Sequence, residues 1–157
     1  MVSLIQTTSA APPQQIAVTG VSDALGGLAG GEIVPDGGGN PHLNAAAFFG
    51  GFELHGDGVL ITGSQIVVLN GVVDQTLSGP VAGSFTVTSD VNGGGATIWS
   101  GTVHGFVEGL IFTGRAVAQG QGPYAGQKLT LYFQERPATP ENPNPEIFDL
   151  AGFLTRP

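Results

Sequence analysis

The sequence predicts an all-β fold: a single antiparallel barrel, or a closed sandwich, of about eight strands with Gly/Pro-rich loops. The first observation is composition, because 27 of the 157 residues are glycine and 11 are proline. A glycine inside a helix costs roughly 1 kcal/mol relative to alanine, so these residues disfavour helices. The second is a hydrophobic content of 41%, which argues against disorder. The third is a succession of hairpin signals between alternating segments.

The first third of the chain contains one expected strand and a long glycine-rich segment. Residues 1–14 are expected to form a flexible arm that ends in two prolines, and a single barrel domain would occupy residues 15–157. The segment Gln15–Thr19 is a candidate first strand. Residues 22–44 are expected to lack regular structure, either closing one end of the barrel or forming a surface excursion, since long loops tend to be functional.

A hairpin is predicted next. The segments Ala45–Leu54 and Val59–Leu69 flank Gly56-Asp57, and this turn would place Leu54 opposite Val59. Two-residue connections that contain glycine are typical of tight hairpins.

Turn signals and shorter strands follow. Asn70-Gly71 predicts a turn and Val72–Leu77 a short strand, after which Val81–Ser89 alternates apolar and polar residues. The segment Asp90–Gly95 is expected to be a plain turn. A calcium loop would require an acidic residue at its twelfth position, where Gly101 stands.

The stretch from Ala96 to Glu135 contains the hairpin around which the fold is expected to form. With Glu108-Gly109 as its loop, Val107 would face Leu110, and Gly105 would lie opposite Phe112 and leave room for its ring. One face would be a packed core, and it carries Trp99, Val103, Val107, Leu110, Phe112, Ala116 and Ala118. The other face would be polar, and it carries Ser100, Thr102, His104, Thr113, Arg115 and Gln119.

Two more strands are expected at the end of the chain. The segment Lys128–Gln134 alternates leucine and phenylalanine with polar residues. A proline-rich bridge, Arg136–Glu146, is expected to be extended and to lead into a last strand, Ile147–Leu154. A strand that returns after such a bridge would close the sheet into a barrel.

The C-terminal third resembles a known group of barrels. The run FTGRAVAQGQGPYAGQKLTLYF, followed by FDLAGFL, is similar to the closing strands of small barrels of the allene oxide cyclase type, a group that includes plant dirigent proteins and bacterial barrel cyclases. The resemblance implies a barrel. It implies no catalytic residue, because none of the group's catalytic positions is matched here.

Charge and composition disfavour several classes of function. Four basic residues against twelve acidic ones give a net charge of −8, which disfavours binding to nucleic acid and to anionic membranes. The chain has no cysteine, and His42, His55 and His104 share no ligand spacing, so no metal and no cofactor is expected. We expect a soluble acidic protein, and its compartment stays undecided.

The polar face of the central hairpin supplies the candidate chemistry. His104, Arg115 and Tyr132 could form an acid/base or anion-binding group if this face lined a lumen. The alternative is an outer face of ordinary strand residues. Candidate ligand contacts come from aromatic residues and from polar neighbours of this group: Trp99, Thr102, Phe112, Thr113 and Tyr124.

Three classes of function remain after these exclusions. The first is a barrel that binds a small apolar molecule, with cyclase or isomerase activity by holding that molecule in a reactive conformation. The second is a structural or self-assembling subunit of a shell, filament or virion surface, which the low charge favours. The third is a glycan-binding module, disfavoured because Trp99 is expected to be buried. Whether the protein is an enzyme, and whether it forms homo-oligomers, stays open.

Overall fold

The computed structural model describes residues 11–23, 28–90, 92, 94–109, 111–141 and 146–157. Its regular elements are strands and one 3-10 turn, Gly122–Tyr124, so the predicted all-β class is confirmed. The strands are β1 Gln14–Asp23, β2 Leu28–Pro35, β3 Pro41–Gly56, β4 Val59–Val72, β5 Gly79–Thr88, β6 Thr97–Glu108, β7 Ile111–Gly120, β8 Lys128–Glu135 and β9 Ile147–Arg156.

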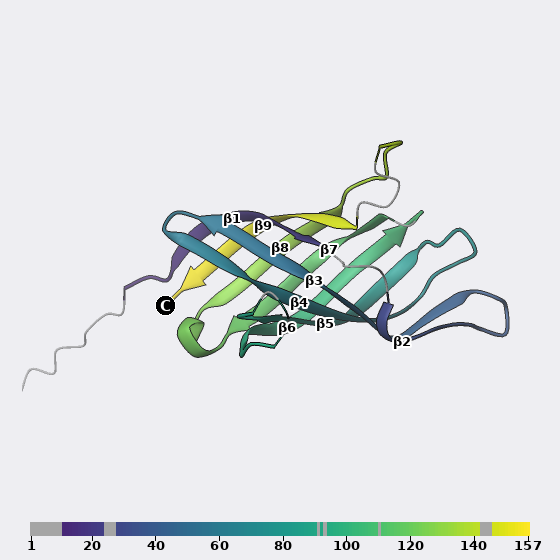
Figure 1. Ribbon diagram of the computed structural model, residues 1–157, viewed down its shortest axis with the longest axis horizontal. Coiled ribbons are helices and arrows are strands. Elements are labelled where there is room, and N and C mark those ends of the chain that lie inside the picture. Colours follow the sequence, from purple (N-terminus) through teal and green to yellow (C-terminus); the bar gives the residue numbers. More distant parts are fainter. Residues whose placement is uncertain (1–10, 24–27, 91, 93, 110, 142–145) are drawn as a thin grey trace, which may run out of the picture.

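Eight of these strands form a closed antiparallel barrel (Figure 1). Strands β3 to β9 pair with their neighbours in chain order, and β1 closes the barrel because it pairs with both β9 and β3. Strand β2 is an additional strand that pairs with the first part of β3. Thus β1 and β2 lie one after the other along the same edge of β3, and the β2–β3 hairpin extends beyond one end of the barrel.

Strict alternation along the strands separates the barrel interior from its exterior. On β6 and β8, for example, Val103 and Leu131 are buried, whereas Thr102 and Tyr132 are exposed. The predicted core face of the central hairpin is therefore the interior face, and the predicted polar face is the outer surface. Leu110, which was assigned to the core face, lies outside the described residues.

Both predicted hairpin turns are displaced by one residue toward the C-terminus. Gly56 pairs with Val59, so the first loop is Asp57-Gly58, and Gly58 adopts a φ of 63° that favours glycine. Glu108 pairs with Ile111, so the second loop begins at Gly109. The faces are unchanged, because each correction moves a residue's partner by two positions and leaves the side-chain alternation intact.

Two segments differ from the sequence-based expectation. The range 22–44 contains β2 and the start of β3 rather than a long irregular loop, because pairing with β3 orders this glycine-rich stretch. Asn70-Gly71 is not a turn but lies inside β4, and the turn follows at Asp74, whose carboxylate accepts hydrogen bonds from the backbone N–H groups of Thr76 and Ser78. The short strand predicted over Val72–Leu77 is therefore absent.

The ends of the chain are described in part. Most of the predicted flexible arm lies outside the described residues, as do residues 142–145 of the predicted proline-rich bridge. Arg136 forms an ion pair with Asp149 at 2.6 Å between Nη2 and Oδ1. This pair connects the beginning of the bridge to β9, which was predicted to be the closing strand and does pair with β1 and β8.

Candidate functional site: an apolar lumen with buried acceptors

One half of the barrel interior contains a cavity of about 330 Å³. It lies toward the end at which β1, β4, β6 and β8 finish and β3, β5, β7 and β9 begin. Its lining is mostly aliphatic and aromatic, and the lining residues are Ser22, Ile33, Leu43, Phe48, Gln65, Val67, Leu69, Val73, Leu77, Phe85, Val107, Phe112, Ala116, Leu131, Phe133, Glu135, Glu146, Phe148 and Leu150. A concave apolar surface with a few polar groups is the usual form of a small-molecule site.

Three phenylalanines build one wall of the cavity. The ring centroids of Phe112 and Phe133 lie 4.8 Å apart, and each lies 6.2 Å from that of Phe148, all in edge-to-face arrangements. Glycines make room for this cluster, because a Cβ on Gly105 would lie 2.5 Å from the Phe112 ring, and one on Gly114 would lie 2.7 Å from the Phe133 ring. The sequence correctly predicted that Gly105 accommodates Phe112, although the strand partner of Gly105 is Gly114.

Glu135 places a carboxyl group beside these rings. It is the last residue of β8 and continues the inward alternation of Leu131 and Phe133, so its side chain reaches the cavity. Its Oε2 accepts a hydrogen bond of 3.0 Å from the Phe112 N–H, which fixes its position. Burial raises the pKa of Glu135 above its ordinary value, the Phe112 hydrogen bond opposes that shift, and the negative charge of Glu146 adds to it.

A second group of polar side chains, from β1 and β4, lies on the other side of β9 from Glu135. Gln65 is 7% exposed and Ser22 is 4% exposed, and both line the cavity. The Gln65 amide donates a hydrogen bond of 3.3 Å to the carbonyl oxygen of Asp23. Gly50 is required here, because a Cβ at this position would collide with the same carbonyl group.

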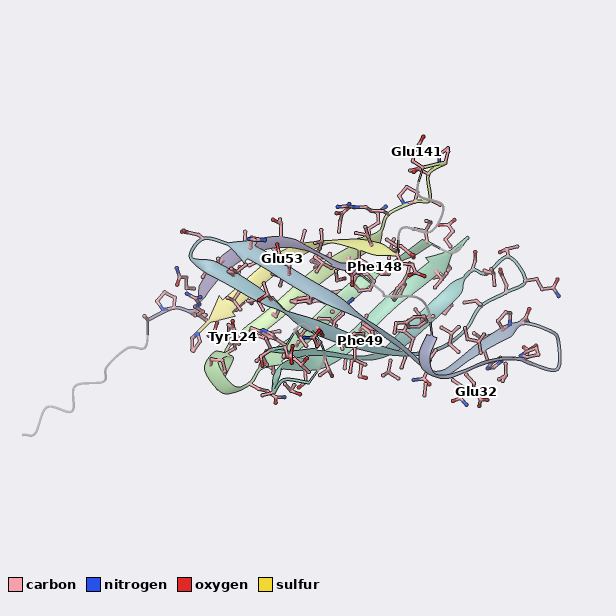
Figure 2. The ribbon with its side chains drawn as sticks, in the orientation of Figure 1. Glu32, Phe49, Glu53, Tyr124, Glu141 and Phe148 are labelled. Carbon is pink, nitrogen blue, oxygen red and sulfur yellow. The ribbon has the colours of Figure 1, made fainter. Side chains whose placement is uncertain are left out.

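The other half of the interior is filled by side chains. Trp99 is fully buried, as predicted, and its ring lies 5.1 Å from the ring of Tyr124 in the 3-10 turn. Figure 2 shows Tyr124 and Phe148 toward opposite ends of the barrel. Trp99 and Tyr124 therefore seal one end, and neither of these two predicted ligand contacts lines the cavity.

The three predicted catalytic residues are neighbours on the outer surface. Arg115 of β7 lies directly opposite His104 of β6 and Tyr132 of β8, whereas the predicted Glu108-Gly109 loop would have placed Arg115 opposite Thr102. The Arg115 guanidinium carbon lies 5.8 Å from the Tyr132 ring centroid, and Tyr132 is 54% exposed. Their predicted catalytic role is not tested by this position, but a ligand inside the lumen would not contact them.

Among the predicted ligand contacts, Phe112 lines the cavity, whereas Thr102 and Thr113 lie on the outer surface. Sequence reasoning missed the polar residues of the lumen. The available signal was that Glu135 and Gln65 share the alternation of their apolar neighbours, Phe133 and Val67. A polar residue at an inward position is a stronger indication of a site than a polar residue on a polar face.

Within the described residues, no group of three or more His, Asp or Glu side chains is placed to hold a metal ion. No helix in the described part of the chain has the length and apolar character needed to cross a membrane. Comparisons with family models, with curated proteins and with solved structures found no match to this chain.

Proposed function

We propose that the protein binds a small apolar molecule inside the open half of the barrel. The observation that supports this proposal is the cavity of about 330 Å³, lined by aliphatic side chains and five phenylalanines in a barrel whose other end is filled. Burial of an apolar ligand against this surface would gain roughly 25 cal/mol for each Å² removed from water.

Cyclase or isomerase activity is the finer form of the proposal. A flexible apolar substrate confined between the phenylalanine wall and the opposite strands would be restricted to folded conformers, and this restriction lowers the entropic barrier to an intramolecular reaction. Glu135 would be the acid/base group in contact with such a substrate, because it reaches the cavity in apolar surroundings.

Two neighbouring valines allow a matched test of the binding site. Val67 lines the cavity, whereas Val68 follows it on the outer face of β4, opposite Ala47 and Ser84. N-phenyl-1-naphthylamine, an uncharged dye that fluoresces in apolar surroundings, is titrated into the wild type, Val67→Trp and Val68→Trp. We expect Val67→Trp to abolish the fluorescence increase because the indole fills the lumen, and Val68→Trp to retain it.

Circular dichroism and thermal melting of both variants establish that they are folded. Equal dye binding by folded Val67→Trp and Val68→Trp would place the dye outside the lumen and contradict the proposal.

Self-assembly is the second candidate, and two observations favour it. Strand β2 is paired only with β3 among the described strands, so its other edge is available for pairing. Several large apolar side chains are also exposed on the surface, among them Leu60 at 62% and Phe106 at 46%. Size-exclusion chromatography with light scattering tests this candidate: a stable oligomer at micromolar concentration would favour a structural subunit, and a monomer would favour the ligand barrel.

A further inference from the structure

The described lining of the cavity contains carboxyl groups and neutral polar side chains but no basic side chain. Four lining residues are polar or acidic, namely Ser22, Gln65, Glu135 and Glu146, and none of the lining residues is Lys, Arg or His. The lining is otherwise apolar. A ligand that enters this cavity therefore meets hydrocarbon, two neutral polar side chains that can donate and accept hydrogen bonds, and carboxyl groups.

Gln65 and Ser22 show that this polarity is built into the interior. Both side chains are more than nine-tenths buried. The Gln65 amide donates a hydrogen bond to the Asp23 carbonyl oxygen, and Gln65 and Ser22 both line the cavity. Buried polar groups are nearly always paired in proteins, so polar side chains in the wall of a ligand-sized cavity are suited to pair with a polar group of the ligand.

Glu135 adds a fixed carboxyl group on the other side of Phe148. The Phe112 N–H holds its Oε2 in place, and the strand pairing of Glu135 with Phe148 sets the carboxyl beside the aromatic wall. Glu146 contributes a second carboxyl to the same cavity, and the chain carries a net charge of −8. An anionic head group would meet like charge here, whereas an ammonium group would form charge-assisted hydrogen bonds.

We propose that the lumen selects apolar molecules whose polar end is a hydrogen-bond donor, primary amines above all, and rejects carboxylates, with Glu135 as the residue that binds the amine. This proposal rests on the proposed function of the lumen and names its ligand class. Because Gln65 and Ser22 are neutral side chains that can both donate and accept hydrogen bonds, a neutral alcohol would also be accepted, with affinity between those of the amine and the carboxylate.

Three compounds of equal chain length test this selectivity: octylamine, octan-1-ol and octanoate. Their affinities are measured by isothermal titration calorimetry at pH 7.5 with the wild type, Glu135→Gln and Glu108→Gln. Glu108 is an exposed carboxyl at the end of β6, so its variant controls for the change in net charge. We expect octylamine to bind about tenfold more tightly than octanoate, and Glu135→Gln, but not Glu108→Gln, to remove that preference.

The outcomes separate the two proposals. Binding of octan-1-ol with equal or tighter binding of octanoate than of octylamine would overturn the amine selectivity and leave the ligand lumen standing. Binding of none of the three would overturn both. If Glu135→Gln does not fold, the wild type supplies the test: protonation of Glu135 at falling pH should weaken octylamine binding and leave octan-1-ol binding unchanged, and equal pH dependence for both would overturn the role of Glu135.

Discussion

At the scale of single residues, the tryptophan of the sealed end contributes both stability and an unsatisfied polar atom. Trp99 has no exposed surface, and its Nε1 finds no acceptor within the described residues. The large apolar ring stabilises the fold by its burial, while the unpaired N–H opposes part of that gain because it has left water without a replacement partner.

Trp99→Ala and Trp99→Phe separate these two contributions. We expect Trp99→Ala to lower the free energy of unfolding by about 3–5 kcal/mol, the usual range for a buried aromatic residue. Trp99→Phe should cost clearly less, because it retains most of the ring and removes the unpaired N–H. Urea unfolding followed by far-UV circular dichroism measures both, and equal losses would show that the N–H has a partner in solution.

The Glu135 carboxyl predicts how stability depends on pH. Its pKa is raised above 4.5 in the folded protein, chiefly by burial. The folded state therefore binds this proton more tightly than the unfolded state, so the resulting stabilisation is full below about pH 4.5 and is lost as pH rises through the folded pKa. Glu135→Gln should melt at a higher temperature than the wild type at pH 7, with the difference closing near pH 4. Glu108→Gln is the matched control. A difference in melting temperature between Glu135→Gln and the wild type that stays the same from pH 7 to pH 4 would contradict a raised pKa of Glu135.

Residue types alone located only part of the site. Phe112 lines the cavity, in agreement with its predicted place on the core face, and Trp99 was correctly predicted to be buried. His104 and Arg115 were predicted as site residues in part because histidine and basic residues are rare in this chain, yet the structure places both on the outer surface of the barrel. Glu135 was missed because an acid at the end of a strand is common, and only the closed barrel shows that this end opens into a cavity.

At the scale of secondary-structure elements, alternation proved more reliable than turn position. Both hairpin loops differ by one residue from their predicted positions, but the division of the side chains into two faces was predicted correctly, because period-two alternation does not depend on where the loop begins. Strand β2 was not predicted, because its own sequence does not indicate a strand. Its sequence, with Gly30 and Gly31, has little strand preference, and it is ordered by pairing with β3.

Strand β9 is the element on which closure depends. It pairs along its length with β1 on one side and β8 on the other. Deletion of residues 147–157 should therefore open the barrel, expose two strand edges and cause aggregation. Light scattering and the fraction of soluble protein measure this effect. Phe153→Ser, which alters a 45%-exposed side chain on the same strand and keeps the pairing, should stay soluble. A soluble and equally stable truncated protein would show that β9 does not close the barrel.

At the scale of the whole molecule, the barrel divides into a filled half and a hollow half. The filled half contains the most completely buried side chains, including Leu54, Trp99 and Leu154. The hollow half is bordered by β2, where Ile33 lines the cavity and is nevertheless 52% exposed. Stability is thus expected to be concentrated at one end of the molecule and ligand access at the other, a distribution typical of binding proteins.

Hydrogen exchange of the native protein tests this division. The amides of Val103 on β6 and Leu131 on β8 lie in strands paired on both sides and should exchange only on global unfolding. The amides of β2 should exchange faster, by local opening, because β2 has one described neighbour and its residues 31–35 are all exposed. Strand β1 is the internal control, since it lies along the same edge of β3 but is also paired with β9.

Local opening of β2 would move Ile33 away from the cavity and widen its mouth without breaking the eight-stranded barrel. A bound apolar ligand should then slow exchange in β2 more than in β1, and equal protection of both strands without ligand would argue against β2 as the route of access.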